Sequence, residues 1–249
     1  MSRSDKFQPP GIEQQKRFYN ERWTNKKRIL NRLKLLRTIA ILDAIARTNI
    51  REPAIVDLGC GDGWLPSILG HFGPTHGVDL SDAAVVEAAE RYPWVSFEYA
   101  DILNWDHPPA TFDIVISHEV IEHVDDQTKY LQIALSLLKP GGYLILTTPN
   151  ARTFDSMPQA RRQAWSDQPN EKWLTRKELK GLLRQAGFEM VMLDTLIPWG
   201  GAGAWRTLAN SGRLRRALRR LHLDRWYEDR YLKHGFGLHT MAVAQRDSK

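Results

Sequence analysis

The sequence predicts an α/β fold, in which a doubly wound and mostly parallel sheet carries helices on both faces. Two observations lead to this fold class. Short β-branched apolar runs alternate with helical patterns through the middle of the chain, as in repeated strand–helix–strand units. The first run, 54–58, also enters a turn with glycines at alternate positions, Gly59, Gly61 and Gly63, and a helical stretch follows at once. A buried strand that reaches a helix through a glycine turn is typical of such sheets.

Length and composition fit one domain of this kind with additions. The chain has 249 residues, no apolar run as long as a membrane span, and a polar start without a signal-peptide pattern. Its single cysteine, Cys60, rules out a disulfide framework and a cysteine-based metal site. We therefore expect a cytoplasmic protein.

The charge is uneven along the chain. The net charge is +6 and the pI is about 9.5, so acidic partners are to be considered. The basic residues gather in two segments, with Arg22, Lys26, Lys27, Arg28, Arg32, Lys34 and Arg37 near the start and Arg206, Arg213, Arg215, Arg216, Arg219, Arg220 and Arg225 near the end.

The glycine turn is predicted to hold a ligand. Alternate glycines allow positive φ and remove the Cβ atoms that would block a close approach, and the following helix offers free N–H groups. The dinucleotide pattern G-x-G-x-x-G would need a glycine where Trp64 stands. The segment instead reads D-x-G-x-G-x-G, from Asp57 to Gly63, and Cys60 within it is expected to contribute a backbone contact.

Two more acids follow predicted strands. The second strand, 75–79, ends at Asp79, about 20 residues beyond the glycine turn, where a carboxylate can accept both hydroxyls of a ribose. The third strand, 95–100, leads to Asp101. A lone aspartate at such a place is usually a helix cap, but acids at the ends of three successive strands indicate a nucleoside site.

The fourth and fifth strands complete the central pattern. The fourth, 112–117, enters the segment H-E-V-I-E-H-V, and a helix is expected from about 126 to 138 before the stop K-P-G-G. The fifth strand covers 143–148. After a polar stretch, a capping box places a helix from Thr175 to 186, and a sixth strand is expected over 188–197.

Together these motifs resemble those of class I methyltransferases that use S-adenosylmethionine (SAM). The resemblance rests on D-x-G-x-G-x-G, F-D-I-V, E-V-I-E-H-V and L-L-K-P-G-G-Y-L-I-L-T-T-P-N, and it is strong from Ile55 to Asn150. Within the superfamily, the branch with the ubiquinone-biosynthesis O-methyltransferases is most similar. The resemblance implies a Rossmann-like sheet of seven strands with an antiparallel last strand, preceded by an N-terminal helical cap. The family closes the sheet with a hairpin, but the segment 198–236 is far longer than a hairpin needs, so a helical insertion is expected before the last strand.

The resemblance also implies SAM as the cofactor. At the position of Asp101 such enzymes have an acid that accepts the exocyclic amine of adenine, and Ile102 would pack on the ring. The residues expected to bind SAM are Asp57, Gly59, Cys60, Gly61, Gly63, Asp79, Leu80, Asp101, Ile102, Ser117 and Glu119.

Methyl transfer to a hydroxyl requires the removal of a proton. In related small-molecule methyltransferases, a histidine in the segment matching Glu122–His123 is the base, so His123 is the first candidate and His118 the second. A structural role for His123 at a helix start is the alternative. Glu119, Glu122 and His123 also form E-x-x-E-H, which resembles part of the metal site of small-RNA 2′-O-methyltransferases. Those enzymes take another histidine from the segment after the fifth strand, and 150–174 contains none, so no metal is expected.

The predicted organisation has four parts. Residues 1–49 form an N-terminal helical cap, 50–197 the SAM-binding core, 198–236 a basic helical insertion, and 237–249 the last strand and tail. Within the cap, one helix is expected over 11–49. Its early aromatic residues are placed either over the cofactor cleft or against the core: Phe18, Tyr19 and Trp23.

The leading function is methylation of a hydroxyl or amine on a small-molecule acceptor, with lipid-linked and anionic acceptors considered. The alternative is RNA 2′-O-methylation, less favoured because no RNA-binding module is recognisable. Leu214, Leu218 and Leu221 share one face of a predicted helix flanked by arginines. This basic segment, 206–225, is a candidate for peripheral contact with an anionic membrane or lipid, for a substrate lid, or for a homodimer contact.

Overall fold

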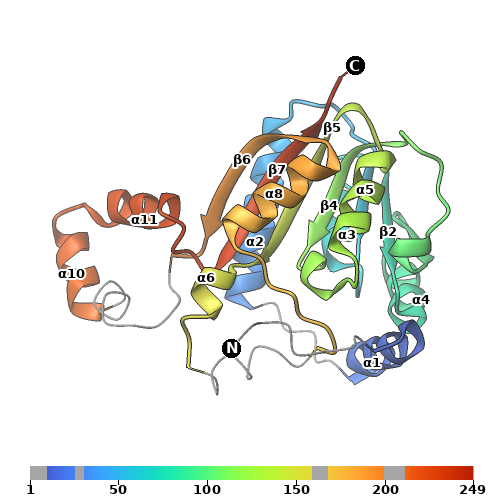
Figure 1. The fold of residues 1–249 in the computed structure, drawn as a ribbon, viewed down its shortest axis with the longest axis horizontal. Coiled ribbons are helices and arrows are strands. Elements are labelled where there is room, and N and C mark those ends of the chain that lie inside the picture. Colours follow the sequence, from blue (N-terminus) through green and yellow to red (C-terminus); the bar gives the residue numbers. More distant parts are fainter. Residues whose placement is uncertain (1–9, 26–30, 159–167, 199–210, 249) are drawn as a thin grey trace.

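A computed structural model describes residues 10–25, 31–158, 168–198 and 211–248. Within these ranges the core is one seven-stranded sheet (Figure 1), in the order β3-β2-β1-β4-β5-β7-β6. Strands β1 to β5 pair in parallel, and β7 is antiparallel to both β5 and β6. The predicted fold class is confirmed. The strands are β1 (Ile55–Leu58), β2 (Thr75–Asp79), β3 (Ser96–Tyr99), β4 (Phe112–His118), β5 (Leu138–Pro149), β6 (Phe188–Leu196) and β7 (His239–Arg246).

Helices cover both faces of the sheet because its central strands are apolar on both sides. One face packs α5 (Gln127–Leu137) and α8 (Arg176–Ala186) against Val56 and Val115. The other packs α2 (Arg32–Arg47) and α3 (Trp64–Leu69) against Ile55, Ile114 and Ile116. Neighbouring residues of one strand thus enter different cores. Helix α4 (Asp82–Arg91) follows β2, and the short α6 (Ala151–Phe154) follows β5.

The N-terminal cap differs from the prediction of one helix over 11–49. The structure has α1 (Ile12–Asn25) and then α2, which begins after Asn31. Asn31 has extended backbone, with φ −92° and ψ 159°, and its side chain accepts a hydrogen bond from the N–H of Lys34. A residue that caps a new helix cannot lie inside a continuous one. The predicted basic residues Lys26, Lys27 and Arg28 lie outside the described residues.

The insertion between β6 and β7 forms two helices where the sequence predicted one. They are α10 (Gly212–Arg220) and α11 (Asp224–Lys233), joined by a short turn. Arg206 falls outside the described residues. Across the described ranges, no helix combines the length and the apolar character that crossing a bilayer would require.

The sheet reverses its strand order at β1, which lies between β2 and β4. In open parallel sheets, ligands bind in the crevice outside the carboxyl ends of the strands at such a switch point. The ends of β1, β2 and β4 carry the residues that the sequence singled out.

Candidate functional site

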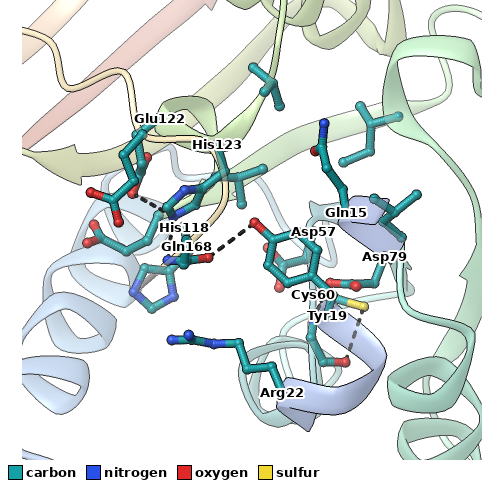
Figure 2. Close-up of a pocket in the computed structure, with 18 of the residues that line it drawn as sticks. Gln15, Tyr19, Arg22, Asp57, Cys60, Asp79, His118, Glu122, His123 and Gln168 are labelled. Atoms are coloured by element: carbon teal, nitrogen blue, oxygen red, sulfur yellow. Dashed lines mark hydrogen bonds and ion pairs between the residues drawn. The ribbon is translucent and has the colours of Figure 1, made fainter. Parts of the chain in front are cut away.

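A pocket of about 530 Å³ lies at this switch point, between the carboxyl ends of β1, β2 and β4 and helices α1 and α2. Figure 2 shows labelled side chains from α1 and from the ends of β1, β2 and β4 around this pocket. Most of the residues predicted to bind SAM line the pocket, namely Asp57, Gly59, Cys60, Gly61, Asp79, Leu80, Asp101, Ile102 and Glu119. The candidate bases His118 and His123 line it too.

Gly63 and Ser117 do not line this pocket. A Cβ on Gly63 would lie 2.7 Å from Ala88 and 2.8 Å from the ring of Phe97, so the missing side chain lets α4 and β3 pack against the turn. Ser117 is fully buried, and its hydroxyl accepts a hydrogen bond from Tyr130 at 2.8 Å. Both residues therefore stabilise the structure next to the pocket without lining it.

The glycine turn has the backbone that only glycine adopts readily. Gly59, Gly61 and Gly63 have φ of 79°, 54° and 72°, in the left-handed region. The N–H groups of Gly59 and Cys60 both donate to the carbonyl of Val78 in β2, which holds the turn against the neighbouring strand. The turn therefore presents backbone, not side chains, to the pocket.

Asp79 links the turn to the end of β2. One carboxylate oxygen accepts the Gly61 N–H at 2.7 Å and the other accepts the Ser81 N–H at 2.8 Å. Burial raises the pKa of this carboxyl, and the N–H donors of Ser81 and Gly61 oppose the rise. Asp57 is more isolated. Burial raises its pKa well above the usual value, and its Oδ1 is buried without a hydrogen-bond partner among the described residues.

Helix α1 covers one side of the pocket and is held there by contacts in two directions. Toward β2, Lys16 pairs with Asp82 at 2.9 Å, and the Asn20 side chain donates to the same carboxylate at 2.8 Å. Toward β4, Gln15 donates to Asp125 at 3.2 Å. These contacts place the indole of Trp23 over the backbone of Gly61.

His123 has one tautomer fixed by its neighbours. Its Nδ1 lies 2.8 Å from the carbonyl oxygen of Asn170, which can only accept, so Nδ1 carries the proton. The other ring nitrogen, Nε2, is then an acceptor and receives a hydrogen bond from the Gln168 amide at 2.8 Å. Tyr19 of α1 donates in turn to the Gln168 carbonyl at 3.1 Å, as Figure 2 shows. The lone pair of Nε2 thus lies at the wall of the pocket, where it accepts from the Gln168 side chain.

His118 lies in a different environment. Its Nε2 accepts a hydrogen bond from the Arg37 guanidinium at 3.1 Å, so this lone pair is already used. Burial, with the charge of Arg37 second, lowers the pKa of His118 to about 3. A group with this pKa is a weak base.

Arg37 contacts three other residues that line the pocket, His118, His239 and Glu119. Besides His118, its guanidinium lies 3.1 Å from Nε2 of His239 and 3.8 Å from Glu119. Burial works to raise the pKa of Glu119, but the charges of Arg37 and His239 outweigh it and lower the pKa far below the usual value. Glu119 also has φ of 61°, a conformation that costs a non-glycine residue about 1–3 kcal/mol. The cluster fixes an ionised carboxylate at the end of β4.

Glu122 is set apart from this cluster. It is 1 % exposed, its Oε2 accepts a hydrogen bond from Thr148, and its Oε1 lies 3.7 Å from Nε2 of His123. Burial, with the nearby charge of Glu119 second, raises its pKa well above the usual value. Burial thus opposes the charged form of Glu122, the form in which a carboxylate binds a metal ion. Among the described residues, no group of three or more His, Cys, Asp or Glu is arranged to hold a metal ion.

Acidification is expected to destabilise the fold through His118. Because its pKa falls from 6.5 to about 3 on folding, the unfolded chain takes up the proton first as the pH drops through this window. The free energy of unfolding then decreases as the pH falls. The midpoint temperature of thermal unfolding, measured from neutral pH down to about pH 4, should fall less in His118→Asn than in wild type. An equal drop in both would show that His118 titrates normally.

Several residues of the site were not singled out as site residues from the sequence. Gln168 and Asn170 are 45 and 47 positions from His123, and nothing in their own segment marks them. Arg37 was recognised only as part of a basic segment, and His239 only as part of a strand. Their roles depend on α2 and β7 meeting the end of β4, which no local pattern reveals.

Comparisons with known proteins agree with the motifs. A family model described as a methyltransferase domain matches residues 29–193. A protein named probable S-adenosylmethionine-dependent methyltransferase, from Mycolicibacterium smegmatis, is 32% identical over 154 residues, which cover 60% of this chain and 56% of that protein. The ubiquinone biosynthesis O-methyltransferase of Methylobacterium nodulans is 28% identical over 207 residues, with 74% and 83% covered. The chain spans about half the length of several curated relatives.

A solved structure shares the fold. It is phosphoethanolamine N-methyltransferase 2 of Haemonchus contortus in complex with S-adenosyl-L-methionine, with a TM-score of 0.63 and 18% identity over 92% of this chain and 56% of that one. The resemblance drawn from the motifs is confirmed. Nothing in these comparisons favours an RNA acceptor.

Proposed function

We propose that this chain, which belongs to the family of SAM-dependent methyltransferases, transfers a methyl group from SAM to a hydroxyl of a small-molecule acceptor. The observation that carries the proposal is the fixed tautomer of His123. Its Nε2 is an acceptor at the wall of the same pocket that contains Asp79 and Asp101. A hydroxyl acceptor needs such a base, whereas an amine that is already neutral does not.

The residues of the pocket fit SAM. Asp79 supplies a buried carboxylate for the ribose hydroxyls, while Ile102 and Leu103 offer an apolar surface for an adenine ring. The glycine turn leaves room for close backbone contact, and Lys34 and Arg37 line the same pocket with positive charge suited to a carboxylate. When bound, SAM supplies an electrophilic methyl group on a positively charged sulfur.

The chain's own contribution to the reaction is to remove a proton. Nδ1–H of His123 stays on the carbonyl of Asn170, which keeps Nε2 available as the acceptor atom. The acceptor hydroxyl takes the place of the Gln168 amide at Nε2 and gives up its proton there as the methyl group is transferred. Tyr19 and Gln168 then form the wall beside the acceptor.

Aromatic side chains indicate the class of acceptor. Phe154 and Trp173, with ring centroids 4.9 Å apart, line the pocket together with Tyr19. Flat aromatic surfaces favour an acceptor with a planar ring, because stacked and edge-to-face contacts are stabilising. We therefore place phenolic compounds first among the acceptors.

The proposal is tested by profiling with methyl-labelled SAM. The purified protein is incubated separately with phenols, hydroxy acids, a lipid extract and RNA, and His123→Gln is the control. We expect label in a small-molecule hydroxyl, with phenols strongest, and little label with the variant. Label only in RNA, only on amines, or in no acceptor at all would contradict the proposal.

Activity on the acceptor is expected to be independent of added metal. The burial that raises the pKa of Glu122 and the absence of a histidine between 150 and 174 both argue against a bound divalent ion. Turnover measured after exhaustive EDTA treatment should stay within about twofold of the untreated rate. Loss of turnover that Mg²⁺ or Mn²⁺ restores would give the E-x-x-E-H segment a metal role.

A further inference from the structure

Helices α10 and α11 form an arm, residues 211–233, beyond the β6 edge of the sheet (Figure 1). The arm is anchored at its second helix. Thr195 of β6 donates to the carbonyl of Leu232 at 2.7 Å, Arg176 donates to the carbonyl of Lys233 at 3.0 Å, and Tyr231 is buried. Helix α10, in contrast, has no buried residue. The arm is fixed to the domain at one end and presents its other end outward.

The arm is strongly basic. It contains eight arginine and lysine residues against three acids, while the net charge of the whole chain is only +6. Arg216, Arg219 and Arg220 are exposed, and Arg225 is exposed at the start of α11. Most of the chain's excess positive charge is thus carried by this one element.

An apolar tip lies among these charges. Leu221, Leu223 and Trp226 are 66 %, 44 % and 61 % exposed, although each belongs to a residue type that folded proteins usually bury. Leu221 and Leu223 lie in the turn from α10 to α11, and Trp226 lies in the first turn of α11. Leu214 and Leu218 share the α10 face that leads to this tip and are only half-buried.

We propose that the arm docks on an anionic bilayer surface, with Leu221, Leu223 and Trp226 entering the interface and the arginines contacting lipid headgroups. Exposed leucines and a tryptophan beside arginines match the composition of helices that lie in a membrane interface. A nucleic acid would use the arginines but would leave the apolar tip without a partner. Docking of the arm would bring the proposed methyl transfer to a bilayer surface, and the docking itself does not depend on that function.

Vesicle flotation tests this inference on the full chain. Wild type is mixed with neutral phosphatidylcholine vesicles and with vesicles containing a third phosphatidylglycerol. Wild type should float only with the anionic vesicles, and less at high salt. Because each basic residue near an anionic surface contributes about 1 kcal/mol, a variant with Arg216, Arg219 and Arg220 changed to Gln should bind about 100-fold more weakly.

Matched variants separate charge from location. Changing Lys177, Lys180 and Arg184 of α8 to Gln removes the same number of charges elsewhere and should leave binding within about threefold. Changing Leu221, Leu223 and Trp226 to Ser should abolish binding while the arginines remain. Size-exclusion chromatography and RNA-binding assays are carried out on wild type and on the same variants. Any one of four results would overturn the proposal. These are wild type that does not float, an equal loss of vesicle binding in both charge variants, a dimer that the serine variant dissociates, and RNA binding that needs the tip.

Discussion

Replacing His123 by Gln is expected to lower turnover by about 10²–10⁴-fold, the usual contribution of a general base. Glutamine keeps a polar side chain in the same place but cannot take up the proton that Nε2 receives. SAM affinity should stay within about threefold, because the residues proposed to bind SAM, Asp79 and Asp101, are unchanged. Turnover at saturating acceptor and calorimetric titration with SAM measure the two effects separately.

Two controls make this result specific. His71→Gln changes an exposed histidine outside the pocket and should leave turnover unchanged. His118→Asn changes the other histidine of the pocket, whose Nε2 is occupied by Arg37, and should lower turnover less than His123→Gln does. A structural role alone would predict unchanged turnover in a folded His123→Gln, or loss of stability together with SAM binding.

Replacing Asp79 by Asn is expected to weaken SAM binding by roughly 30- to 1000-fold. Charge-assisted hydrogen bonds from a ribose to a carboxylate account for about 2–4 kcal/mol, and an amide cannot accept both hydroxyls. The change also affects the turn, since the Asp79 carboxylate accepts the N–H groups of both Gly61 and Ser81. The amide of asparagine keeps one acceptor oxygen, so its nitrogen cannot replace the second acceptor and one of these two bonds is lost.

Calorimetric titration with SAM measures the loss, and thermal unfolding shows whether the variant is folded. Asp43→Asn is the matched control, because Asp43 is exposed on α2 outside the site pocket and its carboxylate pairs with Arg47 one turn along the same helix. SAM affinity equal to wild type in a folded Asp79→Asn protein would remove Asp79 from the cofactor site.

Local patterns were enough to predict much of the fold. The predicted capping box at Thr175 and Glu178 is present, and α8 ends at Gly187 with φ of 102°. The glycine turn and the acids at the ends of β1 and β2 were also predicted correctly in position. Each of these features depends on residues within a few positions of one another, and their spacing alone determines the backbone they favour.

The same reasoning failed where two local signals competed. The helical spacing of apolar residues across 11–49 predicted one helix, but Asn31 starts a second helix instead. Asparagine is a strong N-cap and only a moderate helix former, so periodicity alone could not choose between the two. In the arm, helical spacing placed the leucines on one face but did not reveal that the tip is exposed.

The sequence by itself determined the family, the cofactor and the strand ends at which the site forms, because these follow from short motifs. Only the tertiary structure decided how the two candidate bases differ. Arg37 of α2 occupies Nε2 of His118, whereas Asn170 orients His123 with its Nε2 at the pocket. The two histidines lie only five positions apart, His118 at the end of β4 and His123 in the short helical turn that follows it. Their difference comes from partners far away in the chain, which only the packing of α2 and of the segment after β5 brings into contact.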